Sequence, residues 1–288
     1  MVYSILKNIS NDFGQGASEI AFYAQYIIIV TVGMSTFTQS LDMARQSIQS
    51  MVTFMHSLVP LLMTLMLVTG SIATSNLVQP IILFSIQFIG NIINTLVLPF
   101  ILISTALGVV SNISSKVQID KLASLLKSST IWVMGTILTI FVTLLSLEGT
   151  MSSTVDGLTV KITKSAVSTF VPIVGKILGD ATDSVLGATN ILKNAIGLVG
   201  IIVIILICIV PVVKLAILSI TFHITSSILQ PIADSRIIKL LDSIGSTYKI
   251  LFGIVFAVSF ILVIRCDDSC KIRKFKCYVL GVGEYFYG

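Results

Sequence analysis

The residues best suited to do chemistry lie in one polar, glycine-rich passage, 146–200, between long apolar runs. From position 176 onward its polar residues and one glycine recur every three or four positions: Lys176, Asp180, Asp183, Gly187, Asn190 and Asn194. This spacing places them on one face of an α-helix. A second row repeats every four residues, and would let another helix approach closely: Gly175, Gly179, Asp183 and Gly187. We expect the first row, here called the stripe, to line a pore or an interaction surface.

Further charges close to the stripe would support it: Asp156, Lys161, Lys164 and Lys193. Polar and charged residues inside a membrane bundle mark ion or substrate paths more often than lipid-facing surface. In the alternative interpretation, residues four apart such as Lys176 and Asp180 pair on a helix at the membrane surface. The glycines would then serve packing alone, and both interpretations stay open.

Enzyme chemistry has little support. His56 and His223 lie far apart and do not form a His-x3-His zinc site, and the spacing of the C-terminal cysteines matches no common zinc pattern. The chain has no Gly-x-Ser-x-Gly elbow and no phosphate-binding glycine loop ending in Lys-Ser/Thr. Asp180 and Asp183 could share a proton, but two carboxylates three residues apart are more typical of a solvated helix face. We expect no enzyme, no catalytic residue, no metal and no cofactor.

The composition indicates whether the fold is surrounded by water or by lipid. Mean hydropathy is +1.02, 55% of residues are hydrophobic and 11% are charged, against about 25% charged in a typical soluble domain. A soluble fold of 288 residues could not bury so much apolar surface, so we predict an all-α polytopic membrane protein. The net charge is +5, five of the 18 Lys and Arg lie in the C-terminal residues 265–288, and no basic face for nucleic acid lies elsewhere.

Six apolar runs predict about six transmembrane helices, at 20–37, 51–74, 81–110, 129–147, 195–220 and 250–264. Proline removes a backbone donor and clashes one turn back, so helix breaks are expected at Pro99, Pro172 and Pro211. Between the runs, 111–128 and 224–248 are predicted to be amphipathic segments at the membrane surface.

These features divide the chain into five successive regions. They are a polar segment at 1–19; a membrane region with four spans at 20–147; a polar, glycine-rich segment of amphipathic or re-entrant helices at 148–195; a membrane region with two spans at 196–264; and a polar, cysteine-rich tail at 265–288.

An internal repeat is a further interpretation. Lys121-Leu122, Leu126, Ser128 and Gly135 align at constant offset with Lys239-Leu240, Ile244, Ser246 and Gly253. Each unit would consist of a proline-broken span, an amphipathic helix and a glycine-containing span. Transport folds often contain such repeats, with the site between them. Chance similarity between apolar helices is the alternative.

Several passages resemble one known family, stage III sporulation protein AE. They are the runs at 51–66, 75–84, 156–200 and 226–234, and the central one is the most specific. Its matching residues are Asp156-Gly157, Phe170-Val171-Pro172, Val174-Gly175, Asp180-Ala181, Asp183 and Lys193-Asn194. The similarity covers about 20–263.

The resemblance implies a membrane subunit of the channel-like complex that links mother cell and forespore during endospore formation. It implies a location in the mother-cell membrane around the forespore, and partners among the other stage III operon membrane proteins and the forespore-side protein Q complex. Further copies of the chain remain an option. A pore or translocation element is the leading interpretation, and a non-conducting scaffold that anchors the partners is the alternative.

The two ends depart from the family pattern. Family members carry a signal-like segment and a further region before the first span, whereas here the first span begins close to Met1. The tail 265–288 is polar and cysteine-rich where the family continues with an apolar helix. We expect these ends not to be native in character, as after a frameshift, and resequencing of the gene tests this.

Overall fold

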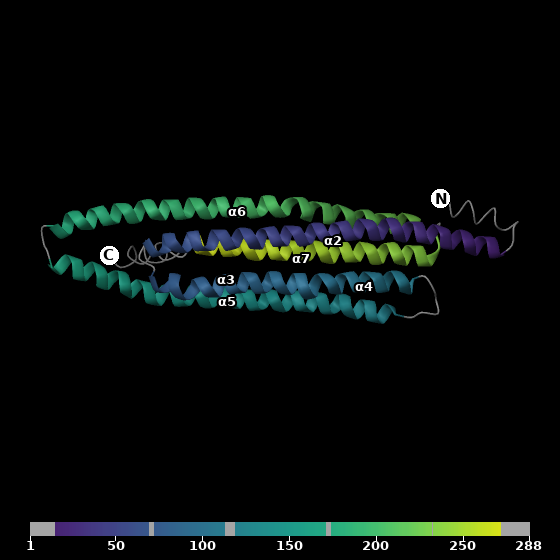
Figure 1. Ribbon diagram of the computed structural model, residues 1–288, viewed down its shortest axis with the longest axis horizontal. Coiled ribbons are helices and arrows are strands. Elements are labelled where there is room, and N and C mark those ends of the chain that lie inside the picture. The colour runs from purple at the N-terminus through teal and green to yellow at the C-terminus, as the bar shows by residue number, and fades with distance from the viewer. Residues whose placement is uncertain (1–14, 69–71, 113–118, 171–173, 232, 272–288) are drawn as a thin grey trace, which may run out of the picture. The chain divides into compact units, whose positions relative to one another are not determined.

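The computed structural model describes residues 15–68, 72–112, 119–170, 174–231 and 233–271, without the side chains of 15–22, 72–78, 145, 147–183 and 267–271. All regular structure in these ranges is helical (Figure 1). The elements are α2 (Gln15–Val68), α3 (Ile72–Ile92), the π-helical turn η1 (Ile93–Val97), α4 (Leu98–Ser111), α5 (Asp120–Phe170), α6 (Val174–Leu229) and α7 (Ser235–Lys271). The predicted all-α fold is confirmed.

Five helical stretches among the described residues are long and apolar enough to cross a membrane: Tyr23–Val68, Gln79–Ser111, Asp120–Leu144, Ser184–Leu229 and Ser235–Cys266. The expected number was six, because 20–37 and 51–74 were taken as separate spans. The polar connector between them is helical instead. It contains no glycine or proline, and Leu41, Ala44 and Ile48 are buried at helical spacing, so nothing in it ends the helix.

The prolines act differently from one another. Pro99 follows the π-helical turn η1, in which the Leu98 N–H donates to the carbonyl of Ile93, five residues back. The predicted break is therefore a wider turn within continuing helix. At Pro211 the expected break is wrong, because α6 remains α-helical through it. One lost hydrogen bond is tolerated in a long apolar helix when neighbouring groups satisfy the freed carbonyl. Pro172 lies outside the described residues.

Contacts divide the chain into two compact units, each formed from three stretches. Unit 1 comprises Met1–Ile48, Asn91–Thr136 and Cys208–Ala257; unit 2 comprises Gln49–Gly90, Ile137–Ile207 and Val258–Gly288. Both units combine stretches from several of the successive regions expected from composition. Helices far apart in the sequence thus share each core.

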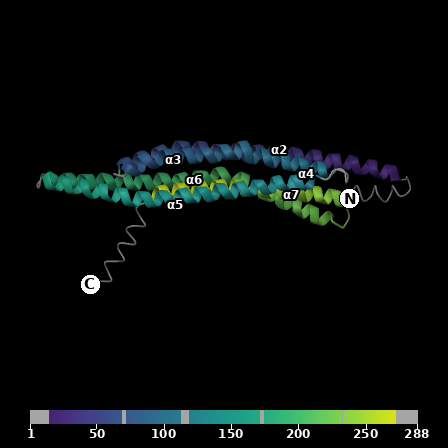
Figure 2. The same cartoon turned by 90° about the horizontal axis from the view of Figure 1, so that it is seen from below.

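Unit 1 is a bundle of parts of α2, α4, α5, α6 and α7. After a short turn α7 runs back along α6 (Figures 1 and 2), and Ser219 and Ser226 Oγ donate to carbonyls of Gly245 and Ile238 on α7. The ring of Tyr248 stacks on Phe222 and meets Phe37 edge-on, with centroid distances of 5.4 and 6.1 Å. The α7 side chain at the centre of the bundle is therefore aromatic and fully buried.

The two segments expected at the membrane surface belong to long helices instead. Residues from 120 begin α5, whereas 224–248 forms the end of α6 and the start of α7. On α7 the side chains of Ile237, Leu240 and Ile244 are buried in the core of unit 1. Two charged residues of these segments, Lys127 and Asp242, contact neighbouring helices, as described below.

Unit 2 is packed through small and polarisable groups. A Cβ at Gly90 would lie 2.9 Å from Val52, and one at Gly200 would lie 2.6 Å from Leu58 and 2.8 Å from Cys266. Cys266 Sγ donates to the Gly197 carbonyl at 3.1 Å, and the Arg265 guanidinium lies 5.6 Å from the Phe141 ring centroid. Arg265 and Cys266 are thus core residues of unit 2, although the sequence assigned them to the tail.

Candidate functional site

The polar centre of unit 1 is the segment 242–248 of α7, which we call the α7 polar segment. Successive residues of this segment meet different helices. Asp242 contacts α6, Ser243 contacts α5, Ile244 meets Gly33 of α2, and Thr247 contacts α4. Four neighbouring helices are therefore held by less than two turns of one helix.

Lys127 of α5 reaches the α7 polar segment at Ser243. Its Nζ donates to the carbonyl oxygen and to Oγ of Ser243, each at 3.1 Å, in a partly buried position. The same carbonyl accepts the Thr247 hydroxyl at 2.9 Å. Hydrogen bonds from a charged donor are stronger than neutral ones, so this contact fixes α5 against α7.

The contact of α4 with α7 is neutral and dry. Thr105 Oγ1 lies 3.3 Å from Thr247 Oγ1, and both residues are buried. A Cβ at Gly108 would lie 3.0 Å from Ser243 Oγ, so a larger residue there would displace this hydroxyl. The glycine thereby permits α4 to approach α7.

The contact of α6 with α7 carries charge. His223 Nδ1 and Asp242 Oδ1 are 2.9 Å apart, with side-chain exposures of 37% and 59%. An ionised carboxylate only accepts hydrogen bonds, so Nδ1 carries the proton and Nε2 of a neutral ring is left as an acceptor. The pair lies at the outer edge of unit 1, one turn or less from the buried contacts of Gly245 with α6.

The sequence of α7 explains its position. Buried apolar residues recur at 237, 240, 241, 244 and 248, which gives a continuous core-facing side. Gly245 allows α6 to come close, because a Cβ there would lie 3.2 Å from Phe222 Cβ. Asp234 Oδ1 accepts the Arg236 N–H at 2.9 Å and caps the start of the helix.

The two helix pairs α4–α5 and α6–α7 share one pairing register. Ser104 Oγ donates to the Ala123 carbonyl at 2.8 Å, and His223 pairs with Asp242; both pairs are 19 residues apart in sequence. In the repeat alignment, in which Lys121 matches Lys239, positions 104 and 123 match 222 and 241. Each of these lies one residue before a member of the His223–Asp242 pair. The internal repeat stays a prediction, because the two contacts have the same sequence separation but differ by one residue from the repeat alignment.

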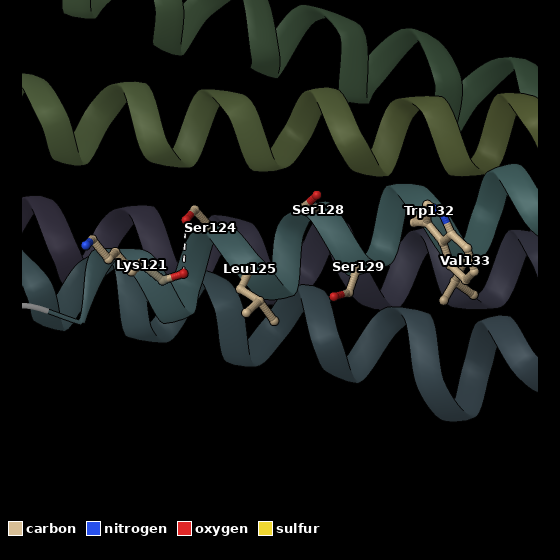
Figure 3. Close-up of a pocket in the computed structure, with 7 residues that line it drawn as sticks. All are labelled: Lys121, Ser124, Leu125, Ser128, Ser129, Trp132 and Val133. Atoms are coloured by element: carbon tan, nitrogen blue, oxygen red, sulfur yellow. Dashed lines mark hydrogen bonds between the residues drawn. The ribbon is translucent and has the colours of Figure 1, made fainter.

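A shallow groove with a volume of about 710 Å³ lies along one face of α5. Figure 3 shows its lining side chains: Lys121, Ser124, Leu125, Ser128, Ser129, Trp132 and Val133. Ser124 Oγ donates to the Lys121 carbonyl within the helix, and the Trp132 side chain is 74% exposed. An indole and a lysine on one exposed helix face are typical of a membrane interface.

The stripe predicted from the sequence lies on one continuous helix, because α6 is helical from Val174 onward. Asn190 and Asn194 are half-buried and Gly187 is exposed, with no described atom within 4 Å of a Cβ placed there. The side chains of Lys176, Asp180 and Asp183 lie outside the described residues. The water-facing role of the stripe stays a prediction. Among described residues, α6 meets other helices closely at Gly197 and Gly200 rather than at Gly187.

Of the supporting charges, too, some have described side chains and others do not. Lys193 is buried in unit 2, with 7% of its surface exposed. The side chains of Asp156, Lys161 and Lys164 are outside the described residues. Asn190 and Asn194 belong to unit 2, whereas the α7 polar segment belongs to unit 1.

Sequence reasoning missed the α7 polar segment and Lys127. The available signal was a run of small and polar residues, Asp242, Ser243, Gly245, Ser246 and Thr247, inside an otherwise apolar helix. Small residues in membrane helices indicate close helix contacts. No such signal links Lys127 to Ser243, since their contact spans 116 residues of sequence.

The arrangement holds ionised groups by hydrogen bonds inside a helix bundle. Among the described residues, no group of three or more His, Cys, Asp or Glu could hold a metal ion. The residues that these hydrogen bonds connect include a lysine, an aspartate and a histidine, supplied by three helices.

Comparison with known proteins gives the family. A family model described as stage III sporulation protein AE matches residues 1–266, a range that includes residues 1–19 and Arg265–Cys266. The stage III sporulation protein AE of Bacillus subtilis (strain 168) is 30% identical over 277 residues, covering 94% of this chain and 69% of that protein. No solved structure matches the chain. With membrane-length helices and a match over most of its length, the chain belongs to the stage III sporulation protein AE family, which has a role in sporulation.

Proposed function

We propose that the chain is a membrane subunit of a complex that links mother cell and forespore during endospore formation, and that it contributes a pore or translocation element. The observation that carries this proposal is the α7 polar segment with its partners Lys127 and His223. Ionisable groups are costly in a membrane and are retained there mainly where they face a path or a partner. A path through the bundle would use these groups, and so would a contact with a partner protein.

The rest of the proposal follows from the family. Its location would be the mother-cell membrane around the forespore, and its partners would be other stage III membrane proteins and the forespore-side protein Q complex. The role is non-enzymatic, and energy for transport would come from elsewhere in the complex. The stripe on α6 would supply the water-facing lining.

A scaffold is the second candidate function, and one observation favours it. The apolar side chains of α6 are extensively exposed, and only 22% of its most apolar stretch is buried. Ile191, Leu206 and Val210 each expose more than half of their surface. This surface suits lipid, but it equally suits partner helices that the chain would anchor.

A cysteine-accessibility scan from 176 to 194 tests the pore, in a cysteine-free background and in membranes that contain the partner proteins. A charged thiol reagent should label 176, 180, 183, 187, 190 and 194, with minima between them. Matched control positions are Ile191 and Leu192, which are exposed on α6 but outside the stripe. Labelling of the stripe in the complex supports a water-filled path. Protection of the stripe, together with sporulation that survives charge removal at 180 and 183, would favour the scaffold.

A further inference from the structure

Three ionisable side chains from three helices meet at two consecutive residues of α7. Lys127 of α5 binds Ser243, and His223 of α6 binds Asp242. The Asp242 carboxylate also attracts the Lys127 ammonium. One carboxylate therefore acts on two groups, the amine of a lysine on one helix and an imidazole on another.

The imidazole is the variable member of this cluster. With Nδ1–H donated to Asp242, the neutral ring has its lone pair on Nε2. Imidazole takes up a proton in the range of about pH 5 to 8. The half-exposed pair can receive that proton from water at Nε2, and no other bond forms or breaks.

The surroundings leave few other charges to act on the pair. In α4 (98–111) and in the stretch of α2 that meets α7 (30–41) the sequence has no charged residue, and in α6 between 215 and 229 His223 is the only titratable one. In the unit 1 part of α5 (120–136) the others are Asp120 and Lys121, and in the unit 1 part of α7 (235–257) they are Arg236, Lys239, Lys249 and the buried Tyr248. Asp234 precedes α7 and accepts the Arg236 N–H. Asp242 is the carboxylate in hydrogen-bond contact with His223.

We propose that His223 and Asp242 form a proton-binding site whose occupancy controls the strength of the contact between Lys127 and Ser243 of α7. A protonated His223 forms an ion pair with Asp242 and offsets its negative charge. The attraction of Asp242 for Lys127 then weakens, which leaves the ammonium with two hydrogen bonds to Ser243 alone. The contact between α5 and α7 loosens when the proton binds and tightens when it leaves.

This inference goes beyond the proposed function, because it concerns the internal contacts of unit 1 and holds whether or not anything crosses the membrane. A comparison with the other helix pair strengthens it. In the α4–α5 pair, one residue from the position that aligns with His223, a neutral Ser104 donates to a backbone carbonyl. Pairing of the helices in this register therefore does not require ionisable groups, and their presence in α6–α7 calls for another role.

The test uses nitroxide labels at Ser128 on α5 and Ser246 on α7, which lie within one turn of the Lys127–Ser243 contact. The full chain, with its four cysteines replaced by alanine, is placed in lipid nanodiscs. The dipolar coupling between the labels should weaken as the pH is lowered from about 8 to about 5. His223→Gln should keep the strong coupling at every pH, and Asp242→Asn should show the weak coupling at every pH.

The matched control is His56→Gln, which changes the other histidine of the chain, bonded to Gln87 in unit 2. It should leave the pH response of the labels intact. If His223→Gln or Asp242→Asn does not fold, Lys127→Met provides a second test. It should give weak coupling that does not change with pH. A wild-type coupling that does not change with pH, or a response that persists in His223→Gln, would overturn the proposal.

Discussion

The helix pairs α4–α5 and α6–α7 of unit 1 pair in the same register but with different chemistry. In the first pair, a serine hydroxyl donates to a backbone carbonyl; in the second, a histidine and an aspartate meet one residue beyond the aligned positions. At the aligned positions Gly135 and Gly253 a Cβ would meet no described atom within 4 Å, whereas one at Gly245, which aligns with Lys127, would meet α6. The comparison indicates that the two pairs share a packing register, whereas ionisable groups join the facing helices at the His223–Asp242 contact and not at the Ser104–Ala123 contact.

The largest effect is expected from filling the α6–α7 contact. In Gly245→Leu the new side chain would begin 3.2 Å from Phe222 Cβ and 3.3 Å from the His223 ring, and overpacking of this kind costs about 3 kcal/mol. The free energy of unfolding in detergent micelles measures it. Gly135→Leu is the matched control and should stay within about 0.5 kcal/mol of wild type. Equal losses at both positions would show that the two glycines do not differ as described.

The next effect concerns the cation that joins α5 to α7. Lys127→Met retains an unbranched apolar stem but loses two hydrogen bonds to Ser243, so the free energy of unfolding should fall by about 1.5 kcal/mol. Lys121→Met, on the exposed face of the same helix, should change it by less than about 0.5 kcal/mol. If Lys121→Met costs as much as Lys127→Met, the loss reflects general charge removal and not the contact with Ser243.

The sequence predicted the all-helical membrane fold well, because composition and apolar run length determine it. It was also sufficient to propose the repeat, since Lys121, Ser128 and Gly135 match Lys239, Ser246 and Gly253. The described residues contain five membrane-length helices where the sequence predicted about six spans. Polarity suggested a connector at 38–50, but only packing of residues such as Leu41 and Ile48 reveals that it is helical.

The candidate site was the least predictable part. A single sequence shows that Lys127 and Asp242 are charged, and charge in an apolar chain was therefore assigned to the membrane surface. Their partners, Ser243 and His223, are distant in sequence or on another helix, so the stabilising contact is visible only in three dimensions. Helical spacing did place the stripe on one helix, because that property is local.

The two helix pairs should lose the same free energy of unfolding when one interhelical serine hydroxyl is removed from each. Ser104→Ala and Ser219→Ala each remove one hydroxyl that donates to a backbone carbonyl of the facing helix, at 2.8 and 3.1 Å. Interhelical hydrogen bonds of membrane proteins contribute about 0.6 kcal/mol on average. Both variants should lose about this amount of unfolding free energy, and the double variant about their sum. A loss in only one of the pairs would argue against a repeated packing frame.

The smallest effect is expected at the charged pair itself. His223→Gln at pH 8 replaces a half-exposed hydrogen bond to Asp242, and exposed pairs contribute only a few tenths of a kcal/mol. The same unfolding measurement, with Asp242→Asn beside it, checks this value, and Thr221→Val on the exposed side of α6 serves as a control for surface change. A loss as large as that of Gly245→Leu would make the pair a structural anchor of the α6–α7 contact. A small loss means that packing and the serine hydrogen bonds hold α6 against α7, so His223 and Asp242 are free to respond to protons without unfolding the bundle.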